Sequence, residues 1–163
     1  MRHLIRLCLS FFAIFSLSSC SGFVPLYGNN SEYREELSRI EIEDNNSIKA
    51  SEVYYHLSKL FGNNHSTKYL LKITNISDNT YPIAISGHSR LVKQNIANQY
   101  KYELLSKETG LLLDSGKIRI VGSYKAQENA YSSYTSERIT SKNIARNVAQ
   151  EIYARILLYF STK

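Results

Sequence analysis

Hydrophobic and polar residues alternate along four segments of the chain, which is the pattern of half-buried β-strands. The segments are residues 37–44, residues 69–74, a long stretch that ends at residue 105, and residues 111–124. Each segment has one apolar side. In the last of them, for example, Ile118 and Ile120 alternate with Lys117 and Arg119. One face of the predicted sheet is therefore apolar and the other is polar.

Two further segments have apolar residues at helical spacing. The first is residues 48–61, where the apolar positions are Ala50, Val53, Leu57, Leu60 and Phe61. The second is residues 136–160, where one stripe contains Ala145, Val148, Ala149, Ile152, Ile156 and Tyr159. Basic residues lie off this stripe, which indicates that one side of the second helix packs on a core.

Turn-forming residues separate these elements. The sequence ISDNTYP, residues 76–82, predicts a turn, and residues 83–85 are interpreted as either a short strand or an extended loop. The sequence SKETG, residues 106–110, predicts a hairpin with Gly110 at a positive φ angle. Gly116 and Gly122 interrupt the following strand and are interpreted as β-bulges.

The order of the predicted elements is β-α-β-β-β-α. Because each strand has one apolar face, two helices that cover this face bury it completely. The predicted fold class is therefore α+β, a two-layer sandwich with two helices packed on one face of a roughly four-stranded sheet. The 13 tyrosines and the absence of tryptophan suit a sheet with amphipathic faces.

The N-terminal residues have the pattern of an export signal. Arg2 and Arg6 precede an apolar run of secretory length, which is too short to span a bilayer as a helix. Small residues then lead to Cys20, and the sequence LSSC resembles a bacterial lipobox, in which the cysteine thiol receives the lipid. The alternative interpretation is an ordinary signal peptide that is cut near Ser19, with Cys20 an incidental thiol.

The lipobox interpretation divides the chain into a signal peptide (1–19), a lipidated tether (20–31) and a single sandwich domain (32–163). The chain has two cysteines, and Cys8 lies in the segment that is removed, so no disulfide is expected. Several acyl chains on Cys20 give stable anchoring. By analogy with lipoprotein sorting, Ser21 after the lipidated cysteine favours the outer membrane, with the domain on its periplasmic side.

Charge and chemistry limit the function further. The 20 basic residues become 18 when Arg2 and Arg6 are removed, against 14 acidic ones, a modest excess that permits an anionic partner. The histidines have no metal-ligand spacing, and no nucleophile or phosphate-loop motif is present. We therefore expect no catalysis, no metal and no cofactor, while a cryptic envelope enzyme is a minor alternative. Nucleic acid is not expected as a partner of an exported, lipid-anchored protein.

Four basic residues are predicted to gather on the polar face of the sheet: Lys72, Lys101, Lys117 and Arg119. One interpretation is a solvated surface. The other is a basic surface that meets an anionic ligand or the polar interior of a partner.

Three stretches carry a resemblance to a known family. They are GFVPLYG just after Cys20, the hairpin sequence YKYELLSKETGLLLDSGKIRIVGSY, and the closing helix YSSYTSERITSKNIARNVAQEIYARILLYF. In this order, behind a lipobox, they resemble the LptE-type lipopolysaccharide-assembly lipoproteins, notably the alphaproteobacterial branch. The middle of the chain matches only in pattern, and Lys142 and Asn143 depart from the small residues usual in the closing helix.

The resemblance implies that the protein sits as a plug in the outer-membrane β-barrel LptD and supports insertion of lipopolysaccharide into the outer leaflet. It also implies binding of lipopolysaccharide, for which Lys72, Lys101, Lys117 and Arg119 are the candidate residues. Phe23, Pro25, Leu26 and Tyr27 are candidate contacts with the barrel or the membrane. The alternative is a generic outer-membrane lipoprotein that binds a periplasmic ligand or peptidoglycan and has no barrel partner.

Overall fold

The computed structural model describes residues 31–43, 47–62, 66–85, 92–126 and 129–162. The predicted signal peptide and most of the predicted tether lie outside these residues. So do the predicted lipidation site Cys20 and the predicted contact residues Phe23, Pro25, Leu26 and Tyr27.

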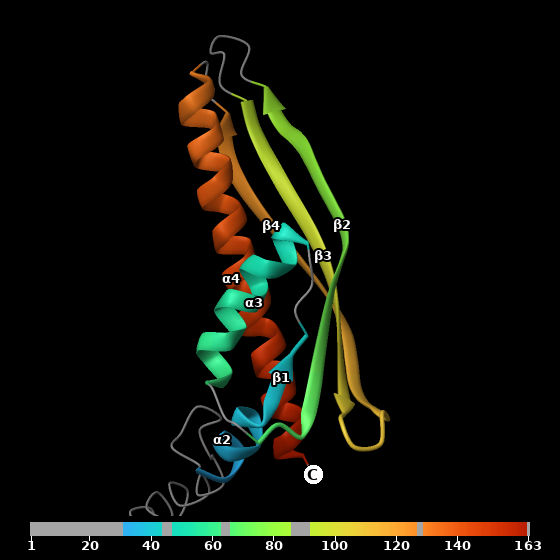
Figure 1. Ribbon diagram of the computed structural model, residues 1–163. Coiled ribbons are helices and arrows are strands. Elements are labelled where there is room, and N and C mark those ends of the chain that lie inside the picture. The colour runs from blue at the N-terminus through green and yellow to red at the C-terminus, as the bar shows by residue number, and fades with distance from the viewer. Residues whose placement is uncertain (1–30, 44–46, 63–65, 86–91, 127–128, 163) are drawn as a thin grey trace, which may run out of the picture. The chain divides into compact units, whose positions relative to one another are not determined.

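The described residues form a mixed four-stranded sheet covered by helices. The elements in chain order are α2 (Ser31–Ser38), β1 (Ile40–Ile42), α3 (Ile48–Phe61), β2 (Tyr69–Ile85), β3 (Val92–Ser106), β4 (Leu112–Ala126) and α4 (Ala130–Ser161). The sheet order is β1-β2-β3-β4, with β1 parallel to β2 and the other neighbours antiparallel. Helices α3 and α4 lie on the same side of the sheet (Figure 1). The predicted α+β sandwich and its β-α-β-β-β-α order are confirmed, with α2 as an additional helix.

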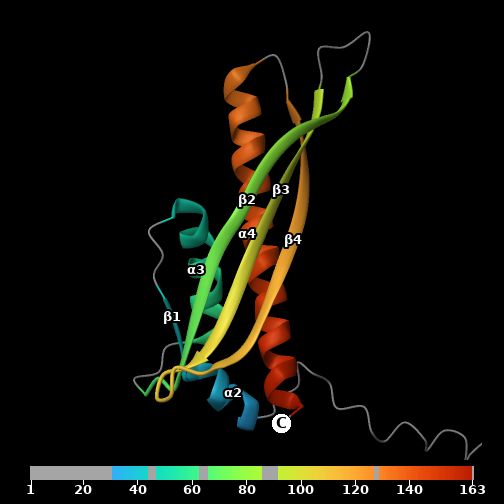
Figure 2. The same cartoon turned by 90° about the vertical axis from the view of Figure 1, so that its right-hand side faces the viewer.

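Helix α4 follows the length of the long strands, whereas α3 reaches only part of the way (Figures 1 and 2). The predicted stripe of α4 faces the core, where Val148, Ala149, Ile152 and Ile156 are completely buried. It meets Tyr100, Tyr102 and Leu104 of β3 in one continuous core cluster. We refer below to the end where α2, the β3–β4 hairpin and the C-terminus of α4 meet as the base of the domain, and to the opposite end as the top.

Two local predictions are confirmed at the level of single residues. Helix α3 covers the predicted residues 48–61, although Leu60 is 40% exposed and does not join the core as expected. In the β3–β4 hairpin Gly110 has a φ of 69°, and its N–H donates to the carbonyl of Ser106 at 2.9 Å. A residue without a Cβ adopts this conformation at least cost.

The predicted turn at residues 76–82 is wrong, because these residues lie inside β2. They pair with β3 through two register shifts, one between Asn75 and Ser77 and one between Pro82 and Ala84. A bulge accommodates an extra residue without ending the strand, so it absorbs the turn-forming residues that the sequence places here. Residues 83–85, for which a loop was the alternative, are also part of β2.

The first predicted strand is shorter than expected. Only Ile40–Ile42 is extended, and Leu37 belongs to α2, where it is 2% exposed. Arg39, the residue just after the C-terminus of α2, forms ion pairs with Glu35 and Glu36 of that helix. The spacing of Leu37, Ile40 and Ile42 fits either interpretation, since one step of three residues and one of two do not separate a helix end from a strand.

The predicted bulges at Gly116 and Gly122 are also wrong, because both glycines pair regularly with β3. Each lies where another side chain comes close to the strand. A Cβ at Gly116 would be 2.7 Å from Tyr102 Cε1, and one at Gly122 would be 2.7 Å from Thr140 Cγ2. Glycine at position 122 therefore allows α4 to pack directly on β4.

Replacing Gly122 by valine is expected to lower the free energy of unfolding by about 1–3 kcal/mol, because Thr140 and Ile144 must move to admit the side chain. Denaturant unfolding followed by circular dichroism measures the change. Val121→Ala is the control, since Val121 is 47% exposed and its truncation is expected to change stability by less than about 0.5 kcal/mol. Equal effects of the two substitutions would contradict the close packing of α4 on β4.

Candidate functional site

The strands β2, β3 and β4 divide their side chains between two faces. Tyr100, Tyr102 and Leu104 of β3 point toward the helices and are buried. The residues between them, Lys101 and Glu103, point to the opposite side. We call this side the outer face. Figure 2 looks onto it, with the strands in front of α4.

The structure places all four predicted basic residues on the outer face. Lys101 is directly opposite Thr74 on β2 and Lys117 on β4. Lys72 is opposite Glu103, and Arg119 is opposite Gln99. The pairing register therefore brings residues far apart in sequence into one continuous surface, as the alternation of the strands predicts.

Two of the four basic side chains are neutralised and two are not. Lys72 Nζ lies 3.2 Å from Glu43 Oε1, and Lys101 Nζ lies 2.7 Å from Glu103 Oε1. Lys117 and Arg119 are exposed. Within the described residues neither forms an ion pair with an acidic side chain.

Sequence reasoning missed two basic residues of the outer face, Lys93 and Lys125. They are directly opposite each other near the top of the domain, and both are exposed. The same alternation that identified Lys101 and Lys117 extends to them. They were missed because the predicted return strand ends at residue 124 and the prediction assigns no start to the long strand before it.

The outer face thus contains two pairs of like charges directly across from each other, Lys93 with Lys125 and Lys101 with Lys117. Like charges at directly opposed positions of an antiparallel pair destabilise a sheet. Glu103 offsets this for Lys101, whereas no described acidic side chain does so for the pair near the top. The arrangement suits an anionic ligand, since phosphate or carboxylate groups placed between the lysines would remove the repulsion.

The backbone of β4 beneath Lys117 is held from the inner side. Arg155 of α4 donates from Nη1 to the carbonyl of Lys117 at 3.4 Å, and from Nε to Glu151 at 2.9 Å. The hydroxyl of Tyr102 donates to Asp114 at 2.9 Å. Burial and then this hydrogen bond raise the pKa of Tyr102 to about 12, so the hydroxyl keeps the proton that it donates to Asp114 even in mildly alkaline solution. The strand that presents Lys117 and Arg119 is therefore fixed by polar contacts as well as by the core.

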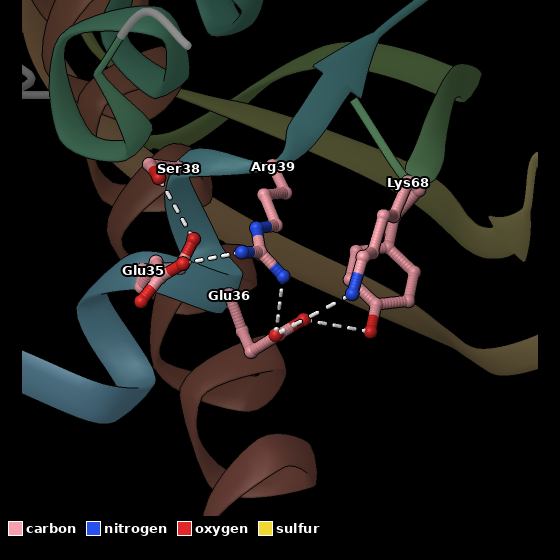
Figure 3. Close-up of polar contacts among 6 residues, drawn as sticks. Glu35, Glu36, Ser38, Arg39 and Lys68 are labelled. Carbon is pink, nitrogen blue, oxygen red and sulfur yellow. Dashed lines mark hydrogen bonds and ion pairs between the residues drawn. The ribbon is translucent and has the colours of Figure 1, made fainter. Parts of the chain in front are cut away.

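A second polar cluster lies at the base, around Glu36 of α2 (Figure 3). Glu36 accepts from Arg39 Nη1 at 3.0 Å and from the Tyr69 hydroxyl at 2.8 Å, and Lys68 Nζ lies 4.0 Å away. Burial and then the bond to Glu36 raise the pKa of Tyr69 to about 12. The cluster joins α2 to the start of β2.

Neither a metal centre nor a membrane-spanning helix is found in the part of the chain that the structure describes. No group of three or more histidine, cysteine or acidic side chains is close enough to hold a metal ion. No described helix is long and apolar enough to cross a membrane. His56 is half-buried on α3, where partial burial and Arg146 lower its pKa, and His65 and His88 lie outside the described residues.

Comparison with known proteins identifies the class of fold. The architecture is similar to the crystal structure of a candidate lipoprotein from Caulobacter crescentus, with a TM-score of 0.69 and 12% identity over 82% of this chain and 98% of that one. It is also similar to the solution structure of an uncharacterized lipoprotein B from Nitrosomonas europaea, with a TM-score of 0.56 and 15% identity over 75% of this chain and 82% of that one.

In sequence, the chain is 29% identical to an uncharacterized protein of Rickettsia prowazekii over 147 residues, which are 90% of this chain and 92% of that protein. No protein-family model matches. At these levels of identity the solved structures establish the fold alone: a sheet-and-helix sandwich also found in bacterial lipoproteins.

Proposed function

We propose that this chain is an outer-membrane lipoprotein, anchored through lipid on Cys20 on the periplasmic side, that binds lipopolysaccharide and plugs an LptD-type β-barrel. In this role it supports assembly of the barrel and insertion of lipopolysaccharide into the outer leaflet. The proposal assigns the chain no catalytic activity, metal or cofactor. Residues 1–19 are the signal peptide, residues 20–31 the tether and residues 32–163 the working domain.

The proposal rests mainly on two cross-strand pairs of lysines on the outer face, Lys93 with Lys125 and Lys101 with Lys117. Their mutual repulsion is a cost to the free protein that an anionic ligand relieves. The phosphate groups of lipopolysaccharide are such a ligand, and Lys117 and Arg119 are exposed and unpaired among the described acidic residues. The lipobox and the three stretches that resemble LptE-type proteins support the same assignment.

The fold also suits a barrel plug. The described domain is closely packed on its inner side, where one stripe of α4 is buried against the sheet, and polar on its outer side. A polar surface is compatible with the water-filled interior of a large barrel. Phe23, Pro25, Leu26 and Tyr27, between the anchor and α2, are the proposed contacts with the barrel wall or the membrane.

Affinity purification of the tagged, lipidated protein from its native envelope in mild detergent tests the barrel partner. We expect a large β-barrel protein to be recovered in near one-to-one amount and to be identified by mass spectrometry. Recovery of the lipoprotein alone, under conditions that preserve other barrel complexes, would instead favour the generic lipoprotein with a periplasmic ligand.

Removing the charges of Lys117 and Arg119, two of the unneutralised residues of the outer face, tests lipopolysaccharide binding. We expect Lys117→Gln with Arg119→Gln to weaken the affinity for purified lipopolysaccharide by at least about tenfold, because each charge-assisted hydrogen bond contributes about 1.5–3 kcal/mol. Titration calorimetry of the purified protein measures the dissociation constant.

A matched control variant lies on α4. Arg138→Gln with Lys142→Gln also removes one arginine and one lysine, both exposed, and leaves the outer face unchanged. We expect this variant to bind as the parent does, apart from a small effect of net charge. If the two double variants weaken binding equally, the attraction is non-specific and the outer face is not the site.

A further inference from the structure

The base of the domain contains a groove that the proposed function does not use. Its volume is about 460 Å³, in the range of sites that hold a small molecule or part of a lipid. It lies where α2, the starts of β2 and β4, the end of β3 and the end of α4 converge. Its lining includes Tyr33, Glu36, Tyr69, Leu113, Tyr159 and Phe160.

The lining is mainly aromatic and only partly covered. Tyr33, Tyr69, Tyr159 and Phe160 pack against the edge of the core and keep part of their surface exposed. The ring centroids of Tyr69 and Phe160 are 5.1 Å apart in a tilted contact, and those of Phe160 and Tyr159 are 5.2 Å apart in an edge-to-face contact. Tyrosine combines an apolar ring with a polar hydroxyl, and this combination favours the boundary between water and the acyl chains of a membrane.

The short connection between the proposed lipid anchor and α2 limits which surfaces the groove can contact. Ser31 is the first residue of α2, and α2 supplies Tyr33 and Glu36 to the lining. This step rests on the proposed lipid at Cys20. Ten residues lie between Cys20 and Ser31, and the eleven residue-to-residue steps that join them span at most about 36–40 Å when fully extended. The base is thus the part of the described domain that is tied most closely to the anchor.

The charges around the groove suit phospholipid headgroups. Lys68 and Lys107 lie at the base, with side chains 55% and 37% exposed. Each already contacts a carboxylate, Lys68 that of Glu36 and Lys107 that of Glu41. A lysine with a flexible stem can also reach a lipid phosphate while the rings lie deeper.

We propose that, before a barrel encloses the domain, the aromatic groove at its base docks on the phospholipid leaflet that carries the anchor. The rings of Tyr33, Tyr159 and Phe160 occupy the glycerol and upper acyl region, and Lys68 and Lys107 lie at the level of the phosphates. The domain then stands with its base on the membrane and its top directed away from it. This orientation leaves the outer face of the sheet accessible from the side.

The absence of tryptophan from the sequence allows a direct test with single reporters. The lipidated variants Phe160→Trp and Tyr33→Trp each place a unique tryptophan in the groove. Tyr134→Trp, at a position 62% exposed near the top of α4, is the matched control. It lies about 39 Å along the helix from residue 160. Each protein is reconstituted into vesicles of phosphatidylethanolamine and phosphatidylglycerol, with and without a phospholipid that carries a nitroxide on its headgroup.

We expect the nitroxide to remove most of the fluorescence of the two groove reporters, with a blue shift on vesicle binding, and to leave the Tyr134→Trp signal nearly unchanged. Using two groove positions guards against a variant that folds poorly. Equal quenching at all three positions, or quenching at none, would overturn the proposal.

The outcome is independent of the barrel, since the vesicles contain none. Flotation of the vesicles shows separately whether the protein is anchored. If it does not float, the proposed lipid anchor fails and the docking proposal is overturned with it. If it floats without selective quenching, the docking proposal alone fails and the proposed function stands.

Discussion

The substitution Ile152→Ala is expected to lower the free energy of unfolding by about 2–5 kcal/mol, because it leaves a cavity in the centre of the core. Ile152 is 0% exposed and lies on the stripe of α4 that packs on the sheet. Helix α4 also contacts α2 and α3, so a loss of packing along it weakens every layer of the domain. Urea unfolding followed by far-ultraviolet circular dichroism gives the difference.

The same helix supplies a control with the same chemistry. Ile139 also belongs to α4, yet it is 55% exposed. Ile139→Ala removes the same atoms with a small loss of packing, which the higher helix propensity of alanine offsets, so its effect is expected to lie within about 0.5 kcal/mol of zero. A similar loss of stability in both variants would mean that the effect comes from the helix itself and not from the core.

The elements that could be predicted from the sequence are those whose signals are local. Helix α3 begins and ends as predicted because its apolar spacing, Gly62 at its C-terminus and the polar flanks agree. The β3–β4 hairpin follows from strict alternation on both sides of a turn that contains Gly110. In these segments the local preference and the tertiary structure favour the same conformation.

The errors occur where pairing or packing overrides the local preference. Residues 76–82 have the composition of a turn, but β3 supplies a partner strand along their whole length and the bulges absorb the misfit. The sequence predicts bulges at Gly116 and Gly122 because glycine weakens a regular strand. The structure requires glycine at these positions because Tyr102 and helix α4 come close to the backbone, and no local sequence pattern reveals this.

The candidate site could be predicted only in part, for the same reason. Alternation was sufficient to place Lys72, Lys101, Lys117 and Arg119 on one face. It could not reveal that Glu43 neutralises Lys72, since this depends on how β1 pairs with β2. Glu103, by contrast, lies two residues from Lys101 on the same face of β3. The groove at the base is built from five elements, α2, β2, β3, β4 and α4, and only the folded chain brings them together.

Cys20→Ala is expected to abolish incorporation of radiolabelled palmitate into the protein, because the thiol is the only proposed attachment point for lipid. The chain offers a matched control in its other cysteine, Cys8, which lies in the segment that is predicted to be removed. Cys8→Ala is expected to keep full labelling. Labelling that persists in Cys20→Ala, or that is lost in Cys8→Ala, would contradict the lipobox interpretation.

Cell fractionation of the same two variants shows whether the domain is held at the membrane by its lipid alone or also by a barrel. A mature chain without its acyl chains loses the burial that holds it in a bilayer, about 0.8 kcal/mol for each methylene group. If the lipid is the whole attachment, Cys20→Ala will move to the soluble periplasmic fraction as a monomer, as expected for a generic lipoprotein. If the domain is also seated in a barrel, the unlabelled protein will stay with the outer membrane and will be released only when the barrel is unfolded. We expect the second result, because a plug that is enclosed by its partner depends on the lipid for delivery more than for retention.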